Sequence, residues 1–216
     1  MTPRLDELTI ADSPAAWRNC GFEVDGDLCT IGAVRLRLLG DDAADGVVEW
    51  ALGGIEDGAD LDGLPTSVSA GPVSAPSTHP NGVTGLDHVV VISPDLDRTV
   101  AALEEAGLDL RRIREEPTPA GAPRQAFFRL GEPILEVVQA PPEAIERNGG
   151  PGGPAFFWGL ALIAPDLDAS VDAIGEGAGE PRDAVQPGRR IATLKRSAGL
   201  ALPVALMTPP SRDGGG

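Results

Sequence analysis

Features that are scarce in this 216-residue chain exclude several classes of protein. No apolar run approaches the roughly 18 residues of a membrane-spanning helix, and the first residues lack the basic-then-apolar order of a secretory signal. Basic residues are few, 17 against 33 acidic residues, so the formal net charge is −16. A surface this acidic repels phosphate groups, which makes nucleic acid and anionic membranes poor partners. We therefore expect a cytoplasmic protein that binds neither nucleic acid nor membrane.

Cysteine and histidine are equally rare, with two residues of each type. Cys20 and Cys29 lack Cys-x-x-Cys spacing, and we expect reduced, partly buried thiols rather than a disulfide. The sequence shows no Ser/His/Asp or Cys/His arrangement typical of nucleophilic catalysis. The glycines of 149–153 lack the strand-glycine-helix order of a phosphate-binding loop. The two histidines, His79 and His88, are therefore the first candidates for a functional site.

One short segment occurs twice. Residues 91–103 align without gaps on residues 162–174, at an offset of 71 and with seven identical positions. Each copy has the pattern of a buried strand that leads into a helix, and residues 93–95 form the helix cap in the first copy. Two copies of one strand-to-helix unit predict an internal duplication. At the same offset His88 falls on Gly159, so only one copy carries an ionisable side chain there.

Apolar runs, turn residues and two Gly/Pro-rich stretches divide the chain into segments. Each copy of the repeat continues with three further strand patterns, which makes a βαβββ unit. Each unit has one apolar sheet face that it cannot bury alone, so we expect the units to pair. The predicted fold class is α+β, with paired βαβββ units forming a curved mixed sheet around a cleft. The expected segments are a diverged N-terminal α+β segment of shortened units (1–66), a Ser/Pro/Gly-rich connector (67–85), the first unit (86–140), a linker (141–154), the second unit (155–208) and a disordered tail (209–216).

The first unit contains four motifs: Leu86–Val91 (LDHVVV), the helix start Asp95–Asp97 (DLD), Gln125–Gly131 (QAFFRLG) and Ile134–Val138 (ILEVV). Together they resemble the vicinal oxygen chelate superfamily, which includes glyoxalase I, extradiol dioxygenases and bleomycin-resistance proteins. The resemblance is good over the first unit, fair over the second and weak before residue 60. It implies the paired-unit fold of glyoxalase and bleomycin-resistance proteins.

In that superfamily a His or Gln early in the first strand and a Glu in the last strand of each unit hold a divalent metal. The resemblance therefore implies that His88 and Glu136 are metal ligands here, and imidazole and carboxylate suit Zn, Ni, Mn or Fe. It also implies that Glu136 shuttles a proton in catalysis. The second unit departs from the pattern, because Gly159 replaces the His and residues 200–208 contain no acid, His or Gln. His79 is a candidate third metal ligand, although its position lies outside the superfamily's ligand set.

Simpler interpretations exist for the same residues. Glu136 interrupts an apolar strand, and a buried carboxylate needs a cation, a hydrogen-bond donor or water. An ion pair between His88 and Glu136 meets that need without a metal. His79 is more simply explained as a solvated residue of the connector.

Four further residues are candidates for contact with a substrate. Gln125 and Phe127 could line the cleft, although a surface amide explains Gln125 equally well. Arg190 follows a turn into a strand, where its guanidinium could hold a substrate carboxylate; ion pairing on the acidic surface is the alternative. Trp158 begins a strand and belongs either to an aromatic wall of the site or to the core.

Two functions remain open from the sequence. The first is a glyoxalase-like enzyme that binds a small metabolite between the units and uses a divalent metal for lyase, isomerase or dioxygenase-type chemistry. The second is a metal-free protein that binds or sequesters a small molecule, like the bleomycin-resistance members, and the missing second-unit ligands favour it. A scaffold with a vestigial cleft is a third interpretation. The units could pair within one chain or across a homodimer.

Overall fold

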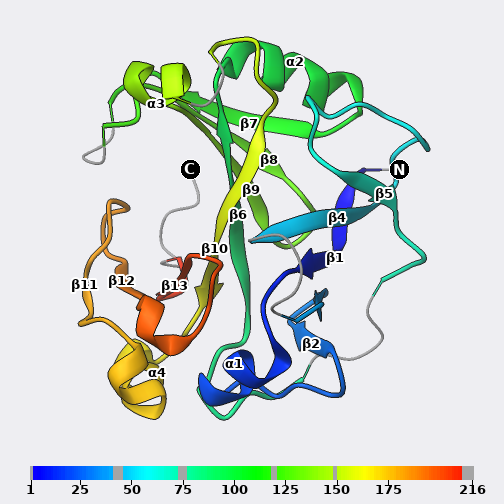
Figure 1. The fold of residues 1–216 in the computed structure, drawn as a ribbon. Helices are drawn as coiled ribbons and strands as arrows, with labels where there is room; N and C mark the ends of the chain where they lie inside the picture. The colour runs from blue at the N-terminus through cyan, green and yellow to red at the C-terminus, as the bar shows by residue number, and fades with distance from the viewer. Residues whose placement is uncertain (1, 41–45, 73–76, 118–120, 148–149, 211–216) are drawn as a thin grey trace.

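The structure is a computed structural model that describes residues 2–40, 46–72, 77–117, 121–147 and 150–210. It contains two β-sheets, which we call sheet A and sheet B (Figure 1). Sheet B has eight strands in the order β11-β12-β13-β10-β6-β9-β8-β7, and sheet A has five in the order β2-β3-β1-β4-β5. Most of the tail predicted to be disordered, from residue 211 onward, lies outside the described residues.

Sheet B is built from two βαβββ units that follow each other in the chain. The first strand of each unit is parallel to the last, β6 to β9 and β10 to β13, and β6 pairs antiparallel with β10 to join the units. The predicted α+β class and the paired units in a curved mixed sheet are thus confirmed, and the pairing occurs within one chain. The first unit comprises β6 (Gly85–Ser93), α2 (Leu96–Glu105), β7 (Asp109–Arg114), β8 (Gln125–Arg129) and β9 (Ile134–Gln139). The second comprises β10 (Phe156–Ile163), α4 (Leu167–Ile174), β11 (Arg182–Asp183), β12 (Arg190–Thr193) and β13 (Val204–Met207).

Both helices of sheet B begin at the repeated aspartates. The Asp95 carboxylate accepts a hydrogen bond from the backbone N–H of Arg98 at 3.1 Å, and Asp166 accepts one from Ala169 at 3.0 Å. Each carboxylate satisfies an N–H that the first helical turn leaves unpaired and interacts favourably with the helix dipole. A further short helix, α3 (Pro142–Arg147), lies in the segment expected to be a linker. No helix within the described ranges is long and apolar enough to cross a membrane.

Sheet A repeats the central pairings of sheet B with fewer strands. β1 is parallel to β3 and antiparallel to β4, as β6 is to β9 and β10. β4 is in turn parallel to β5, as β10 is to β13. The topology of sheet A is therefore that of a reduced pair of the same units, while the segment boundaries drawn from the sequence stay a prediction. Its elements are β1 (Arg4–Ile10), α1 (Pro14–Asn19), β2 (Leu28–Ile31), β3 (Val34–Leu38), β4 (Val47–Gly53) and β5 (Thr66–Val68).

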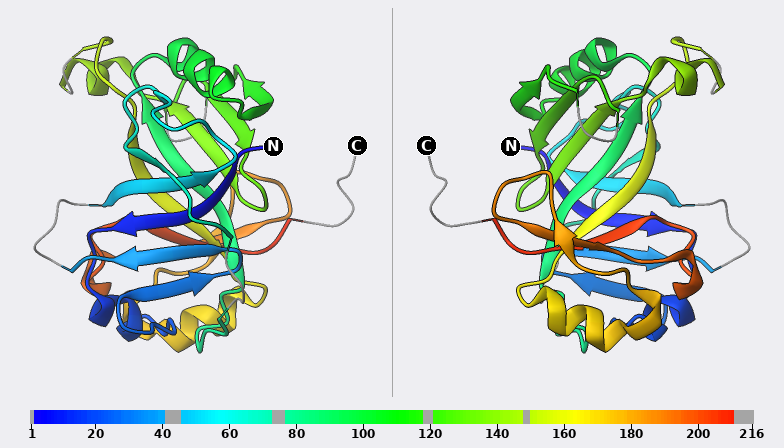
Figure 2. Two further views of the ribbon diagram at one scale, coloured as in Figure 1. Left: turned by 90° about the vertical axis from the view of Figure 1, so that its right-hand side faces the viewer. Right: turned by 90° about the vertical axis from the view of Figure 1, so that its left-hand side faces the viewer.

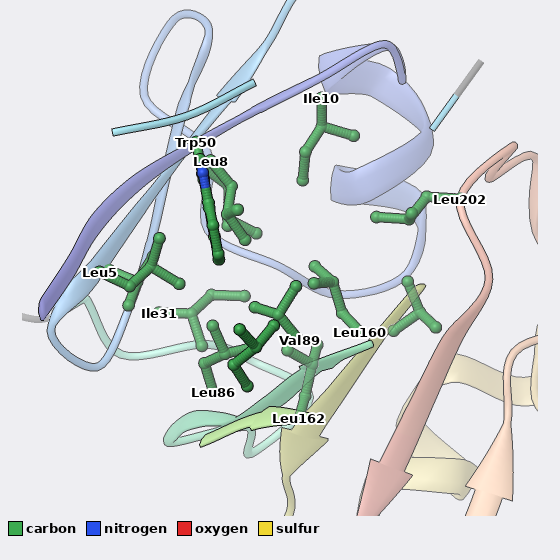
Figure 3. Packing of buried hydrophobic residues seen from close by; sticks show 14 of the residues in the cluster. Leu5, Leu8, Ile10, Ile31, Trp50, Leu86, Val89, Leu160, Leu162 and Leu202 are labelled. Atoms are coloured by element: carbon green, nitrogen blue, oxygen red, sulfur yellow. The ribbon is translucent and has the colours of Figure 1, made fainter. Parts of the chain in front are cut away.

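The hydrophobic core lies between the two sheets. Leu8 and Trp50 of sheet A and Val89 and Leu162 of sheet B are fully buried in one cluster (Figure 3). Figure 2 shows the strands of sheet A running across one face of sheet B. Since successive residues of a strand point to opposite faces, the core takes every second side chain of β6 and β9. The alternate side chains lie on the other face of sheet B and are available for function.

An ion pair between Asp62 and Arg98 links the N-terminal segment to the first unit. Asp62, between β4 and β5, accepts a hydrogen bond at 2.7 Å from Nε of Arg98 on α2. The same guanidinium donates to the carbonyl of Pro151 at 2.8 Å, so it also holds the chain that leads into β10. The Asp62 side chain is only 9% exposed, and a partly buried, charge-assisted contact of this kind is stronger than an exposed surface pair.

Candidate functional site

A cavity of about 310 Å³ opens beside β6 and β9. Val89 and Leu135 are fully buried in the core, so their neighbours His88 and Glu136 point to the opposite face of sheet B. Both side chains line the cavity, together with Phe127 of β8 and residues of the turn that precedes β12. The cavity thus lies on the face of the sheet that the core does not occupy.

A β-bulge directs two consecutive residues of β6 into this cavity. His88 pairs with Ala161 of β10, whereas the next partner, Leu162, pairs with Leu86, so Asp87 is an extra residue in the ladder. A bulge re-aims the side chains around it. Asp87 and His88 therefore both line the cavity, although regular alternation would place them on opposite faces.

The strand register brings His88 and Glu136 together. Nε2 of His88 lies 3.3 Å from Oε2 of Glu136, and the two side chains are 12% and 16% exposed. Gln125 of β8 donates a hydrogen bond from its amide nitrogen to Oε1 of Glu136. Gln125 is 8% exposed and lies diagonally across from Glu136 in the β8–β9 ladder. Each oxygen of the carboxylate thus faces one defined side chain.

A second hydrogen-bond chain holds the other side of the His88 ring. Nδ1 of His88 lies 2.7 Å from Oδ1 of Asp87. Asp87 in turn accepts hydrogen bonds from both terminal nitrogens of Arg189, which comes from the second unit. Arg189 is 6% exposed and also donates to Oε1 of Gln186 at 2.6 Å and to the carbonyl of Thr208 at 2.7 Å. The His88 ring is therefore held by residues of both units.

Burial and these contacts shift the pKa values of the two carboxylates in opposite directions. Burial alone would raise the pKa of Asp87, but hydrogen bonds from His88 and Arg189 outweigh it, and the pKa lies below the usual aspartate value. Burial raises the pKa of Glu136 above its usual value, and the charge of His88 and the hydrogen bond from Gln125 offset only part of that effect. Two carboxylates on either side of one imidazole thus have different acidities, a feature of acid–base sites.

The arrangement fixes how the imidazole is presented. An ionised carboxylate can only accept hydrogen bonds, so the contact with Asp87 places a proton on Nδ1 of His88. Nε2 then faces Glu136 and the cavity, where it can accept or exchange a proton or contact a ligand. A carboxylate behind a histidine is also the arrangement that orients metal-ligating imidazoles.

The described residues supply fewer donors than a resident metal ion usually has. In the first unit Val90 pairs with Glu136. In the second unit the residue equivalent to Val90 is Ala161, and it pairs with Ala205. The second-unit counterparts of His88 and Glu136 are therefore Gly159 and Ala205, neither of which can bind a metal. Across the described residues, no three His, Cys, Asp or Glu side chains gather as a metal site. Two protein ligands fall short of the three or four that zinc sites use.

Sheet A carries an ion pair where sheet B carries the His–Glu pair. Thr9 pairs with Arg37 as Val90 pairs with Glu136, so Glu7, two residues before Thr9, corresponds to His88. Oε1 of Glu7 lies 2.9 Å from Nε of Arg37, and its other oxygen lies 2.8 Å from Nε of Arg35. In sheet A the positions equivalent to His88 and Glu136 are thus occupied by Glu7 and Arg37, which form a salt bridge.

The structure does not bring the other candidates to the same place. His79 is buried, with Nδ1 accepting the backbone N–H of Glu23 at 3.1 Å and Nε2 3.0 Å from the carbonyl of Thr30, and burial lowers its pKa. These contacts place it with the N-terminal segment. Arg190 forms an exposed ion pair with Asp168, and Trp158 is 52% exposed on β10.

Among the polar residues of the cavity, Asp87, Glu132 and Gln186 were not predicted from the sequence, and of the Arg189-Arg190 pair at the turn Arg190 was taken as the candidate. Arg189 directly precedes the candidate Arg190, and only the geometry of the turn decides which of the two guanidiniums faces Asp87. Asp87 directly precedes His88, and its orientation depends on a bulge that strand periodicity does not reveal. The Asp-His sequence was the available signal for Asp87.

No family model and no curated protein matches the sequence, but solved structures match the fold. A xylose isomerase-like TIM barrel/4-hydroxyphenylpyruvate dioxygenase fusion protein aligns over 99% of this chain and 49% of its own, with 12% identity and a TM-score of 0.61. This chain thus spans about half the length of that protein.

Two epimerase structures align with a smaller part of the chain. Methylmalonyl-CoA epimerase from Mycobacterium tuberculosis covers 61% of this chain and 91% of its own, with 20% identity and a TM-score of 0.49. A Streptomyces coelicolor methylmalonyl-CoA epimerase variant in complex with 2-nitronate-propionyl-CoA covers 60% and 99%, with 22% identity and a TM-score of 0.47. Two observations identify the fold: the strand order of sheet B and the alignment of 99% of this chain with the dioxygenase fusion protein. The chain has the fold of the vicinal oxygen chelate superfamily.

Proposed function

We propose that this protein binds a small molecule in the cavity at His88 and Glu136 and that it does so without a resident catalytic metal. The observation that carries the proposal is the chain of contacts from Arg189 through Asp87, His88 and Glu136 to Gln125. This chain holds an imidazole and a carboxylate in one orientation at the wall of a cavity of about 310 Å³. Ligand sites are concave, largely apolar and carry a few oriented polar groups of this kind.

The surrounding cavity wall supports binding of a compact organic ligand. Phe127, Ile134 and Ile163 supply apolar surface, and the His88–Glu136 pair supplies one place where a hydroxyl or carbonyl group can be hydrogen-bonded. Because the polar pair is already oriented by its neighbours, little side-chain entropy is lost when a ligand binds. The same pair could transfer a proton to or from a bound ligand, since imidazole and carboxylate are the commonest general acids and bases.

A metabolite screen by thermal shift tests this proposal. A ligand present at about 100 times its Kd stabilises the folded state by about 2.7 kcal/mol, which raises the melting temperature measurably. Hits from the wild type are then measured by calorimetry with His88→Ala and Glu136→Ala, which should weaken binding at least tenfold. Glu105→Ala, at an exposed position on α2, is the matched control and should bind like the wild type. Hits that bind the His88 and Glu136 variants as tightly as the wild type would refute this assignment of the site.

A second candidate is a divalent-metal-assisted lyase, isomerase or dioxygenase-type enzyme. It is favoured by one observation: Nε2 of His88 and Oε2 of Glu136 face each other at 3.3 Å, with Asp87 behind the ring. Water or the ligand would have to supply the remaining donors. Metal analysis and titration with Zn, Ni, Mn and Fe decide this case. Stoichiometric metal that is lost in both alanine variants would replace the first proposal, whereas the absence of binding to the wild type would remove the second.

A further inference from the structure

A second cavity, of about 230 Å³, lies near α3 and is mainly apolar. It is lined by Pro94, Ala140, Ala144, Ile145, Pro154 and Phe156. α3 directly follows β9 in the chain and lies at the end of that strand (Figure 1). This cavity, which we call the apolar cavity, has no role in the function proposed above.

Both cavities lie on the same face of sheet B. On β9 the alternation that starts at Glu136 passes through Val138 to Ala140, which lines the apolar cavity. The N–H of Ala140 donates to the carbonyl of Ser93 at 2.8 Å, so the ladder between β6 and β9 continues to this residue. The four steps of strand from Glu136 to Ala140 span about 13 Å. The two cavities are therefore two ends of one strip of sheet.

The adjoining strands give the same result. On β6 the alternation that starts at His88 passes through Val90 and Ile92 to Pro94, another residue of the apolar cavity. Phe156 of β10, also in its wall, pairs with Ile92 and so lies on the same face. Between the two cavities the strip carries the apolar side chains of Val90, Ile92 and Val138, with Gln125 of β8 beside Val138, and Gly159, opposite Val90, adds no side chain to it.

The two ends differ in chemistry. The cavity at His88 is lined by the carboxylates of Asp87, Glu132 and Glu136 and by one guanidinium, Arg189, while the charge of Arg114 on β7 acts on Glu136 from outside the lining. The Arg189 guanidinium is already engaged by Asp87, Gln186 and Thr208. An anionic head group would meet this acidic wall unpaired, so the cavity suits a neutral group with hydroxyl or carbonyl oxygens. The other end offers apolar surface and suits a hydrocarbon chain.

We infer that the two cavities form one elongated site for an amphipathic molecule with a neutral, oxygen-bearing head at His88 and Glu136 and an unbranched apolar tail that reaches α3. The inference rests on the proposed function for the position of the head and adds the class of ligand. Burying one methylene lowers the Kd by up to about fourfold. A longer tail should therefore raise affinity until it fills the apolar cavity.

Calorimetry with butane-1,2-diol and decane-1,2-diol tests the inference. The longer diol should bind the wild type at least tenfold more tightly than the shorter one. Ala144→Trp places an indole in the apolar cavity from a half-buried position on α3 and should abolish this gain while binding of the shorter diol stays unchanged. Ala169→Trp, at an exposed position on α4, is the matched control and should retain the gain. Thermal unfolding of each variant confirms that it is folded, and Ala144→Leu serves as a milder blocking variant.

Each outcome addresses one of the two proposals. Equal affinity of the two diols, no binding of either diol, or the same gain in Ala144→Trp as in Ala169→Trp would overturn the inference of an elongated site. Binding of butane-1,2-diol that is unchanged in His88→Ala and Glu136→Gln would instead place the head group elsewhere and contradict the proposed function. Loss of binding of both diols in His88→Ala, with loss of only the chain-length gain in Ala144→Trp, would support both.

Discussion

Single residues in this molecule owe their roles to the partners that orient them. The Asp87 carboxylate serves the site because Arg189 holds it against the His88 ring. In sheet A the carboxylate at the position of His88, Glu7, is held between Arg35 and Arg37 and has no free side towards a ligand. The same position in two related sheets therefore carries a cavity-facing histidine in one and an arginine-paired carboxylate in the other.

The Glu7 ion pairs give a prediction about stability and pH. Burial alone would raise the pKa of Glu7, but hydrogen bonds from Arg35 and Arg37 outweigh it and lower the pKa. The folded state therefore binds this proton less readily than the unfolded state, and the stabilisation is fully present above the unfolded glutamate pKa of about 4.3. Glu7→Gln should cost about 1 kcal/mol at neutral pH, since the arginines are partly exposed and screened.

Urea unfolding at about pH 7 and about pH 4 measures this effect. The difference between the wild type and Glu7→Gln should shrink as the pH falls, because the unfolded wild-type chain takes up a proton at this carboxylate more readily than the folded protein does. Glu105→Gln, at an exposed position on α2, should leave stability unchanged at both values. A Glu7→Gln effect that is constant with pH would contradict the assigned cause.

The two cysteines give a second prediction at this scale. Cys20 and Cys29 are free and buried, and burial together with the charge of Glu23 raises the pKa of Cys29 to about 12. Burial also raises the pKa of Cys20. Because the thiolate is the reactive form, neither should react with Ellman's reagent in the native protein at about pH 8, and both should react at once in denaturant. Rapid stoichiometric labelling of the folded protein would show that one thiol is accessible.

At the scale of elements, the sequence predicted what depends on local pattern. The repeated Pro-Asp-Leu-Asp identified the starts of α2 and α4, because capping by an aspartate is a local interaction. The apolar alternation of β6 and β9, together with the resemblance, predicted that His88 and Glu136 meet. The partners of Asp87 could not be predicted, since a bulge and a turn far along the chain decide which side chains converge. The burial of His79 likewise depends on contacts with Glu23 and Thr30, more than 45 residues away.

The pairing of β10 with β13 gives a prediction about Gly159. A Cβ built on Gly159 would lie 2.6 Å from the carbonyl oxygen of Pro203, closer than the packing allows. Gly159→Ala should therefore cost about 1–3 kcal/mol of unfolding free energy, the usual cost of overpacking. Gly152→Ala is the matched control, because a Cβ there meets nothing within 4 Å. Urea denaturation that shows equal stabilities for the two variants would indicate that the strands separate easily at this point.

At the scale of the whole molecule, the two sheets depend on a common core. Leu5, Leu8 and Trp50 of sheet A are buried in the same cluster as Val89 and Leu160 of sheet B, and each fully buried large side chain contributes about 1.5–3 kcal/mol (Figure 3). The ion pair of Asp62 with Arg98 adds a polar link between the same two parts. The N-terminal segment therefore acts as the second layer of the fold.

A chain that begins at residue 69, after β5, tests this dependence. Without sheet A, the core face of sheet B would be exposed, and the fragment should lose its cooperative urea transition and bind the hydrophobic dye ANS. Adding the peptide of residues 1–68 should restore part of the transition, which distinguishes a missing layer from general misfolding. A fragment that unfolds cooperatively at the midpoint of the full chain would show that sheet B is stable alone.

The close approach of Gly159 to Pro203 bears on which changes of sequence are open to this chain. A histidine at 159 would restore the ligand type that the first unit carries, but its Cβ would collide with a carbonyl that also accepts the N–H of Leu160 at 3.0 Å. The first substitution on that route therefore loses stability before any ligand is gained, and a second change in the chain around Pro203 has to accompany it. A single substitution therefore cannot give the second unit the histidine that the first unit carries at the equivalent position, His88, without a loss of stability.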